Sequence, residues 1–312
     1  MTTSTQSPII LHHFEKSPFS EKVRLAFGLK GIAWTSCITS RTMPRPDLMP
    51  LTGGYRRTPT LQIGADIYCD TQIILREIEQ RFPNPTMYPG GNAGLCMASA
   101  MWSDRVFFQN TVNLVFGTLA HKVPQEFIAD REQLRGQKFD VPAMTAAIPQ
   151  MRDQFRAHAD WIDRQLADGR HWLLGSEASL VDINAYMNVW YVRSNLEDAE
   201  ALIGGFRHLR AWEEKMKNLG HGNREHEITP AQALEIAKQA RPLTPVRADA
   251  GDPNGLKPDD VVAVVPDDYG KIPVTGTIVS LSAQHIAIRR KDDRAGEVVV
   301  HFPRAGFLVT PA

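Results

Sequence analysis

The chain has 312 residues, a length that suits two domains of ordinary size with room for a small third one. Its 35 Lys and Arg residues balance 35 Asp and Glu residues, and this zero net charge removes the usual electrostatic argument for binding nucleic acid or an anionic membrane. Hydrophobic residues make up 43% of the chain and charged residues 22%, which excludes the disordered and collagen-like classes.

The sequence carries no pattern typical of export or membrane insertion. The first residues, MTTSTQSP, place no basic residue before an apolar stretch, and no apolar run approaches the roughly 18 residues of a membrane span. The three cysteines, Cys37, Cys69 and Cys96, form no C-x-x-C pair and have no histidine at metal-ligand spacing. We therefore expect a cytoplasmic protein with reduced, buried thiols, no metal and no membrane or nucleic-acid partner.

Residues 1–90 carry the pattern of a small α/β domain. Short apolar runs predict strands, and a turn at 64–66 predicts a hairpin. The helices are marked at their ends: Ser17 opens the first helix and Gly31 closes it, whereas Asp70 caps the second. The strands are expected at 9–13, 34–39, 60–63 and 67–69, and the helices over 17–31 and 70–82.

Residues 91–240 carry helical spacing of apolar residues and no strand signal, so we expect an all-α domain. Its best-marked helix start is Ser179, which Asp182 follows three residues later in a capping-box pattern. The helices are expected over 93–120, 142–168, 179–195, 206–219 and 230–240.

The composition changes again after residue 240. Residues 241–255 are rich in proline and predict a linker, and residues 256–312 hold short β-rich runs separated by Pro, Gly and Asp turns. A spacing of about ten residues between such runs is typical of a small barrel or sandwich, and the tail resembles SH3-like barrels. The runs lie at 261–265, 274–281, 285–290, 297–302 and 307–310.

Three features of the first domain together favour one elongated, peptide-like ligand. Ser17 lies at a helix N-terminus, where amide groups, the helix dipole and a hydroxyl stabilise an anion such as a thiolate. Thr58 precedes Pro59 at a strand start, where a cis peptide bond would turn the backbone groups of Thr58 outward. Asp70 and Thr71 lie at another helix N-terminus and can hold an amino-acid end. Each feature alone is explained at least as well as a cap or a strand start.

Three segments of the chain resemble glutathione transferases. SPFSEKVRLAF, at 17–27, is similar to the S-P-F-x-x-[KR]-V-R-[IL]-A segment of serine-type enzymes of the tau, zeta or theta kind. RTPTLQIGADIYCDTQIILREIEQRFP, at 57–83, is similar to the segment that completes the glutathione site. GSEASLVDINAY, at 175–186, resembles the capping-box segment of the second domain. The resemblance extends over 1–240 and implies a thioredoxin-like domain followed by an all-helical one.

The resemblance also implies a site and a reaction. Ser17 would donate a hydrogen bond to the glutathione sulfur, Thr58 and Pro59 would hold the cysteinyl unit, and Asp70 and Thr71 would hold the γ-glutamyl end. Glutathione would be the cosubstrate, with no metal, and the enzyme would be a homodimer that transfers it to a small hydrophobic electrophile, as in detoxification. A serine cannot form the mixed disulfide that thiol–disulfide exchange requires.

The chemistry expected of Ser17 is a shift of a thiol pKa. A free thiol has a pKa of about 8.5, so only a small fraction is ionised at neutral pH. A hydroxyl donor and a helix N-terminus need to lower that pKa by about two units, roughly 2.7 kcal/mol, to make the sulfur mostly thiolate. No general base is then required.

The first domain departs from the family pattern at two places. The usual Glu-Ser pair is Asp70-Thr71 here, and its acid is one methylene shorter. The hydrophobic residue that usually stands before the proline is Thr58 here. Arg56 and Arg57 precede it, either to reach the glycyl carboxylate of glutathione or as solvated surface residues.

Two further pairs of residues have both a functional and a structural interpretation. Trp102 and Phe108 would either wall the electrophile pocket between the domains or pack in the helical core. His12 and His13 end the first strand, where one would line the glutathione site or both would pack.

Two other functions are open on the same scaffold. One is a glutathione-dependent isomerase or lyase, in which glutathione is regenerated. The other is a non-catalytic glutathione-binding protein that acts through partners, with the tail as a candidate contact.

Overall fold

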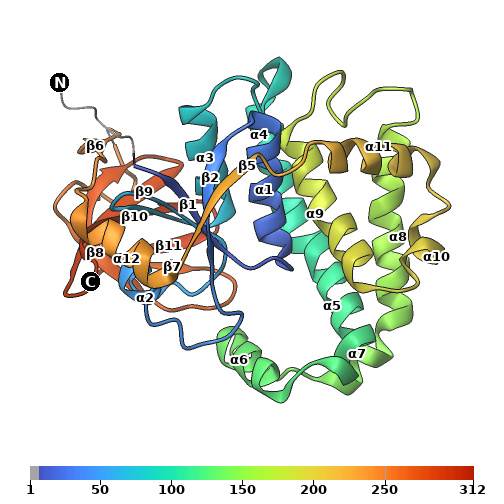
Figure 1. Cartoon of the computed structure of the whole chain (residues 1–312), viewed down its shortest axis with the longest axis horizontal. Coiled ribbons are helices and arrows are strands. Elements are labelled where there is room, and N and C mark those ends of the chain that lie inside the picture. The colour runs from blue at the N-terminus through green and yellow to red at the C-terminus, as the bar shows by residue number, and fades with distance from the viewer. Residues whose placement is uncertain (1–6, 250) are drawn as a thin grey trace.

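The computed structural model describes residues 7–249 and 251–312. A layer of strands and a bundle of helices lie side by side, and helix α1 (Pro18–Lys30) packs against helix α9 (Leu180–Asn195) where the two meet (Figure 1). None of the helices in the described part of the chain combines the length and the apolar character needed to cross a membrane.

The N-terminal part has the expected thioredoxin-like fold. Its central strand β1 pairs in parallel with β2 and antiparallel with β3, and β3 continues antiparallel to β4. Ser17 caps α1, and Gly31 ends it with a φ of 62°, a left-handed conformation that glycine adopts without steric cost. The elements besides α1 are β1 (Ile9–His13), β2 (Ala33–Ile38), α2 (Met49–Thr52), β3 (Thr60–Ile63), β4 (Asp66–Cys69) and α3 (Thr71–Arg81).

The helical part confirms an all-α bundle built around α9. The capping box is present: Asp182 accepts hydrogen bonds from the backbone N–H and the hydroxyl of Ser179, at 3.0 and 2.6 Å. The expected first helix is continuous, but its middle, Trp102–Phe107, is π-helical. Besides α9 the helices are α4 (Ala93–Met101), α5 (Phe108–Leu119), α6 (Gln125–Arg135), α7 (Val141–Ala146), α8 (Ile148–Gln165), α10 (Ala199–Ile203) and α11 (Arg207–Asn218), with short 3-10 turns at Pro89–Gly91 and Ala120–Lys122.

Residues 223–228 differ from the all-helical expectation, whereas the helix expected at 230–240 is present. Strand β5 (Asn223–Ile228) pairs in parallel with β2, and helix α12 (Pro230–Gln239) packs on the same sheet. The segment NREHEI is polar and mostly exposed, so it lacks the apolar alternation that marks a strand in a sequence. Backbone pairing along the edge of β2 makes it a strand, and the chain returns to the sheet before the linker begins.

The C-terminal region is rich in strands, as predicted, but it is attached in a way that the sequence analysis did not foresee. Its strands follow the order β11-β7-β8-β9-β10 with antiparallel pairing, so the last strand returns beside the first. Strand β10 then pairs in parallel with β4, and the tail thereby extends the thioredoxin-like sheet. The strands are β6 (Arg247–Ala248), β7 (Val261–Pro266), β8 (Val274–Leu281), β9 (His285–Asp292), β10 (Gly296–Pro303) and β11 (Phe307–Pro311).

The segment expected to be a linker is hydrogen-bonded to the sheet where β10 pairs with β4. Asp66 of β4 accepts hydrogen bonds from the backbone N–H of Leu243 at 2.7 Å and from the hydroxyl of Thr244 at 2.5 Å. His301 of β10 contacts the same carboxylate at 3.3 Å and approaches His285 of β9 at 3.0 Å. The contact between the tail and the first sheet therefore includes a buried polar cluster around Asp66 and His301.

Two apolar cores lie on either side of the first sheet. One joins α1 and α3 to the helical bundle. The other lies between β4, α2, α12 and the tail, and it contains Ile67, Val300 and Phe302, each without exposed surface. Because the second core is shared, the tail contributes to the stability of the N-terminal part.

Candidate functional site

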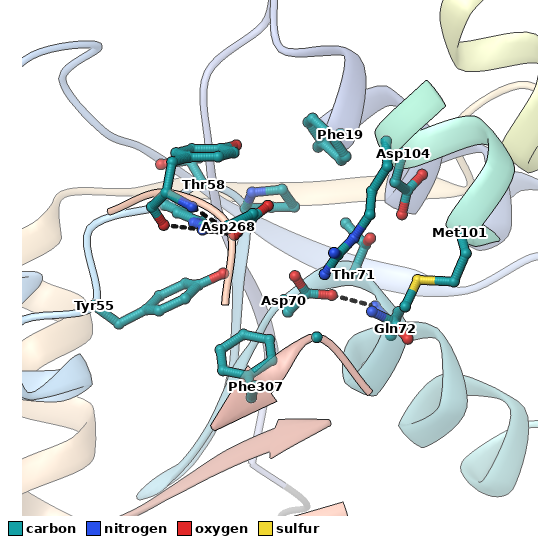
Figure 2. A pocket seen from close by; sticks show the side chains of 15 residues that line it. Phe19, Tyr55, Thr58, Asp70, Thr71, Gln72, Met101, Asp104, Asp268 and Phe307 are labelled. Atoms are coloured by element: carbon teal, nitrogen blue, oxygen red, sulfur yellow. Dashed lines mark hydrogen bonds and ion pairs between the residues drawn. The ribbon is translucent and has the colours of Figure 1, made fainter. Parts of the chain in front are cut away.

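The residues expected to bind glutathione gather in two adjoining cavities near the start of α1. Thr58, Pro59, Asp70 and Thr71 line the first cavity (Figure 2), and the Thr58–Pro59 peptide bond is cis. Thr58 also lines the second cavity, together with Ser17. The structure therefore brings together residues from a helix start, a strand start and a second helix start.

Asp70 caps α3 in an unusual backbone conformation. Its φ is 90°, a region that residues other than glycine rarely occupy, and its Oδ1 accepts a hydrogen bond from the Gln72 N–H at 2.9 Å. Desolvation in the cavity wall raises the pKa of the Asp70 carboxyl, and the nearby Asp104 adds to that rise. Asp104 is in turn paired with the buried Lys22 at 2.8 Å.

Ser17 occupies the N-cap of α1 and is only 2% exposed. Its Oγ accepts a hydrogen bond from the Ser20 N–H at 3.1 Å. A hydroxyl that accepts one hydrogen bond can still donate its own hydrogen. Ser17 can therefore donate a hydrogen bond to an anion that reaches the second cavity. The N-terminal amides of α1 favour negative charge at the same place.

Trp102 and Phe108 have different positions. Phe108 lines the second cavity and packs edge-on against Phe19, with ring centroids 4.8 Å apart. Trp102 is not among the described residues that line either cavity. Its indole N–H donates to His158 at 3.2 Å, and its ring stacks on Phe107 inside the helical bundle.

A loop of the C-terminal region, 267–270, forms part of both cavities, which the sequence analysis missed. Tyr269 lines both, and Asp268 lines the first (Figure 2). The loop is held from two sides: Asp267 pairs with Arg105 at 2.6 Å, and the Gly270 N–H donates to the Leu134 carbonyl at 2.8 Å. The sequence shows only a turn after a strand here, and no local signal places that turn over a distant site.

Arg56 and Arg57, which precede Thr58 and Pro59, each form an ion pair with a carboxylate of the protein. Arg56 is buried and pairs with Asp130 of α6 at 2.5 Å. Arg57 pairs with Asp268 and lies over the Tyr269 ring, 3.9 Å from its centroid. Burial alone would lower the pKa of Arg57, but its interactions with Tyr269, Tyr55 and the Asp268 carboxylate more than offset this and raise it. Neither arginine is a solvated surface residue.

His12 and His13 pack beside the site in polar contacts of their own. Burial lowers the pKa of His12 to about 4, and its Nε2 donates to Gln62 at 2.8 Å. Burial, together with the positive charge of Arg24, lowers the pKa of His13 to about 3, and its Nδ1 accepts from Arg24 at 3.1 Å. Both side chains are fully buried, so they act in packing.

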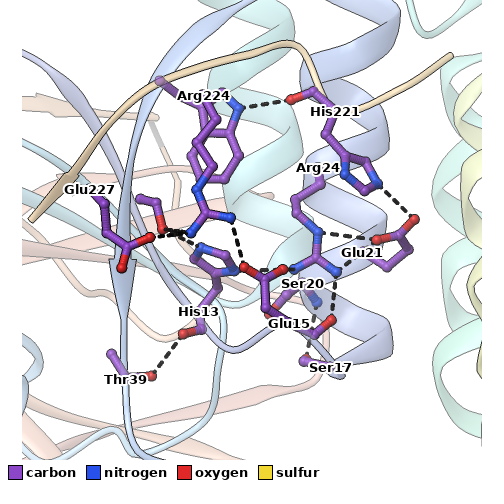
Figure 3. A network of polar contacts seen from close by, with 12 residues as sticks. His13, Glu15, Ser17, Ser20, Glu21, Arg24, Thr39, His221, Arg224 and Glu227 are labelled. Carbon is purple, nitrogen blue, oxygen red and sulfur yellow. Dashed lines mark hydrogen bonds and ion pairs between the residues drawn. The ribbon is translucent and has the colours of Figure 1, made fainter.

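The contacts of His13 belong to a network that ties α1 to the chain beyond the helical bundle (Figure 3). Arg24 pairs with Glu21 at 2.7 Å, and Glu21 accepts from His221 at 2.9 Å. Arg224 of β5 donates to Ser36 of β2 at 2.7 Å. The network lies on the side of α1 that faces β5, and it fixes the helix whose first turn carries Ser17.

The cysteines offer no competing chemistry. All three are buried free thiols. Burial raises the pKa of Cys37 to about 12 and that of Cys96 to about 11, and it raises the pKa of Cys69 as well, so they stay protonated and unreactive. Within residues 7–249 and 251–312 no three His, Cys, Asp or Glu side chains gather as metal ligands would.

A thioredoxin-like sheet joined to an all-α bundle is the arrangement of the glutathione transferase class. Comparisons with known proteins agree: the family model of the glutathione S-transferase N-terminal domain matches residues 11–86, and that of the C-terminal domain matches residues 145–215. A GST-like protein from Pseudomonas syringae, of known crystal structure, is 34% identical, with 98% of this chain and 100% of that chain covered and a TM-score of 0.81. The chain belongs to the glutathione S-transferase family.

Two further relatives differ in how much of the chain they match. FtsZ-localized protein A from Caulobacter vibrioides is 28% identical over 180 residues, which are 56% of this chain and 73% of that protein. A glutathione S-transferase from Rhodospirillum rubrum shares the fold, with 20% identity, 67% of this chain and 87% of that chain covered, and a TM-score of 0.54. The Pseudomonas syringae match covers nearly the whole chain, so it includes the strand-rich C-terminal region.

Proposed function

We propose that this chain is a serine-type glutathione transferase in which Ser17 holds the glutathione sulfur as a thiolate. The observation that carries the proposal is the position of Ser17 at the N-terminus of α1, in the wall of the second cavity. Thr58 lines both this cavity and the first one. In this proposal the backbone of Thr58 beside Pro59 binds the cysteinyl unit. Asp70 and Thr71, at the N-terminus of α3, bind the γ-glutamyl end.

The proposed reaction is a substitution at an electrophilic carbon. The thiolate forms a sulfur–carbon bond, and the leaving group departs with its electron pair. The protein's part is to stabilise negative charge on sulfur through the Ser17 hydroxyl and the α1 amides, with no general base. A cytoplasmic location, a homodimer and a role in detoxification complete the proposal.

The test is the pair of variants Ser17→Ala and Ser20→Ala. Ser20 is also buried near the start of α1, and its hydroxyl has no hydrogen-bond partner among the described residues, so it is a matched control. We expect Ser17→Ala to bind glutathione in calorimetry but to lose the ultraviolet absorbance of bound thiolate at neutral pH. Its kcat/KM should fall about 100-fold, the equivalent of two pKa units. An unchanged thiolate signal, or no glutathione binding by the unaltered protein, would refute the proposal.

Product analysis separates transfer from isomerisation or lyase chemistry. With labelled glutathione, a transferase leaves the label in a thioether product. Label that returns entirely as free glutathione identifies the isomerase or lyase instead.

A second candidate function is a non-catalytic role with a protein partner. The observation that favours it is the similarity to FtsZ-localized protein A. Co-sedimentation of the chain with FtsZ polymers tests this role. Binding that Ser17→Ala leaves intact would show a partner role that does not depend on thiolate formation.

A further inference from the structure

The second cavity is strongly cationic. Seven Lys and Arg side chains line it, and no Asp or Glu side chain does. Among the described residues, the carboxylates that pair with these cations are Asp130, which contacts Arg56 and Arg131, and Asp268, which contacts Arg57. Seven positive groups therefore face two negative ones, although the whole chain is neutral. The seven are Lys16, Arg41, Arg45, Arg56, Arg57, Arg131 and Arg135.

One of these cations is buried with an unused donor. Arg45 is 7% exposed, and its Nη1 donates to the Thr58 hydroxyl at 2.8 Å and to the Arg56 carbonyl at 2.7 Å. Its Nε has no hydrogen-bond partner in the described part of the chain. Burial lowers the pKa of Arg45 to about 10; Arg131 contributes to that shift, and Asp130 offsets it only in part. A buried charge without a counter-ion destabilises the folded protein, and a bound anion would relieve this cost.

Aromatic rings fill the space between these cations. Arg131 lies 4.4 Å and Arg41 lies 5.0 Å from the centroid of the Phe127 ring. Phe116 stacks on Phe127 with centroids 5.7 Å apart and meets Phe139 edge-on at 5.4 Å. Guanidinium groups next to ring faces suit a flat ring that carries a negative substituent, because the ring stacks while the substituent accepts hydrogen bonds.

We propose that the second cavity binds an aromatic anion, a planar ring bearing a carboxylate or sulfonate, as the second substrate. This inference rests on the proposed transferase function, and it replaces a merely apolar electrophile with a charged one. For a nitro-activated chloroarene the thiolate adds to the chlorine-bearing carbon and forms the sulfur–carbon bond; the carbon–chlorine bond then breaks, and chloride leaves with the bonding pair. The carboxylate takes no part in the bond changes and serves to hold the ring among the arginines.

The binding test uses two dyes of nearly the same shape, and no glutathione. Anilinonaphthalene sulfonate is anionic and N-phenylnaphthylamine is its neutral counterpart. Both are titrated by fluorescence into the full chain. We expect the sulfonate to bind at least about tenfold more tightly, and this preference should weaken as salt is added. Equal affinity for the two dyes overturns the inference.

Variants of cavity-lining arginines test whether the dye binds in the second cavity. Arg41→Gln and Arg135→Gln are chosen because neither arginine pairs with a described carboxylate, so no buried acid loses its partner. Each should weaken the sulfonate about five- to tenfold and change the neutral dye less than twofold. Arg152→Gln, whose exposed partner is Asp198, is the charge-matched control and should change neither. The inference is contradicted if Arg41→Gln and Arg135→Gln weaken the binding of both dyes equally. It is also contradicted if neither variant weakens the binding of the sulfonate.

A kinetic experiment distinguishes failure of the inference from failure of the proposed function. Chlorodinitrobenzoate and its methyl ester are compared as substrates with glutathione. A lower KM for the acid, lost in Arg135→Gln, supports the inference. Turnover of both with equal KM rejects the inference and leaves the transferase function standing. No turnover of either, with the dye preference intact, rejects transferase activity and leaves the anion site.

Discussion

Arg57 donates a hydrogen bond to the backbone carbonyl of Tyr269 while its guanidinium lies 3.9 Å from the centroid of the Tyr269 ring. One residue stands before the proline segment of the first sheet, and the other lies in the loop that follows β7. Because Tyr269 lines both cavities, the strand-rich region is a wall of the candidate site.

Replacing Tyr269 should therefore affect the site more than the fold. In Tyr269→Ala the two cavities merge and Arg57 loses its ring contact, so we expect the KM for glutathione to rise about five- to tenfold. Tyr269→Phe keeps the ring and the cation–π contact, worth about 1 kcal/mol, and should behave like the unaltered protein. Steady-state kinetics at saturating electrophile measure the effect. Equal behaviour of the alanine variant and the unaltered protein would remove Tyr269 from the site.

The tail should also stabilise the N-terminal part. Phe302 of β10 is fully buried in the core shared with β4, so Phe302→Ala should lower the free energy of unfolding by about 3–5 kcal/mol. Leu308, on β11, is 56% exposed, and Leu308→Ala should change the free energy of unfolding by less than about 0.5 kcal/mol. Urea denaturation measures both. A single transition that shifts as a whole is expected, and an unshifted transition of the thioredoxin-like part would contradict the shared core.

The Asp182 carboxylate should matter for stability far from the site. Besides Ser179, it accepts hydrogen bonds from the Leu173 N–H and from Trp212 Nε1, both at 2.8 Å. Asp182→Ala leaves these buried donors unpaired, and we expect a loss of at least about 3 kcal/mol. The half-buried Asp160, paired with Arg164, is the control, and its alanine variant should stay within about 0.5 kcal/mol. Loss of tryptophan fluorescence in urea gives both values.

Stability should fall as the solution becomes mildly acidic. Burial lowers the pKa of His12 to about 4, and those of His13 and His285 to about 3, so each stays neutral in the folded chain. The unfolded chain takes up protons below pH 6.5, so the contribution of each histidine is complete above pH 6.5 and is lost toward its folded pKa. At pH 5 each histidine should lower the free energy of unfolding by about 2 kcal/mol.

Urea titrations at pH 7 and pH 5 measure this loss. His285→Gln should show a smaller difference between the two pH values than the unaltered protein does. Stability that is independent of pH over this interval would mean that these histidines bind protons in the folded state.

The elements of the first sheet and the capping box could be predicted because local patterns define them. Ser17 and Gly31 mark both ends of α1, and Ser179 with Asp182 marks the start of α9. Strand β5 could not be predicted, since its polar sequence forms a strand only through pairing with β2.

The gathering of residues around the two cavities could be predicted where they come from chain segments near one another, and was missed where it depends on distant pairing. Thr58 and Asp70 flank one hairpin, so their order in the sequence indicates a common site. Tyr269 reaches that site because β10 pairs with β4, a long-range contact that no local pattern encodes. Trp102 and Phe108 lie on one continuous helix, and periodicity does not say which of its faces meets the first domain.

Both edges of the thioredoxin-like sheet are covered by chain that comes late in the sequence: β5 covers β2, and β10 covers β4. During synthesis, β1 to β4 therefore leave the ribosome before either of their partner strands. Both edges of this sheet stay unpaired while the whole helical bundle is translated. Unpaired edges of this kind can join other chains. Strands β5 and β10 thus close the first sheet, and a nascent chain that stalls before β10 should depend on chaperones to stay in solution.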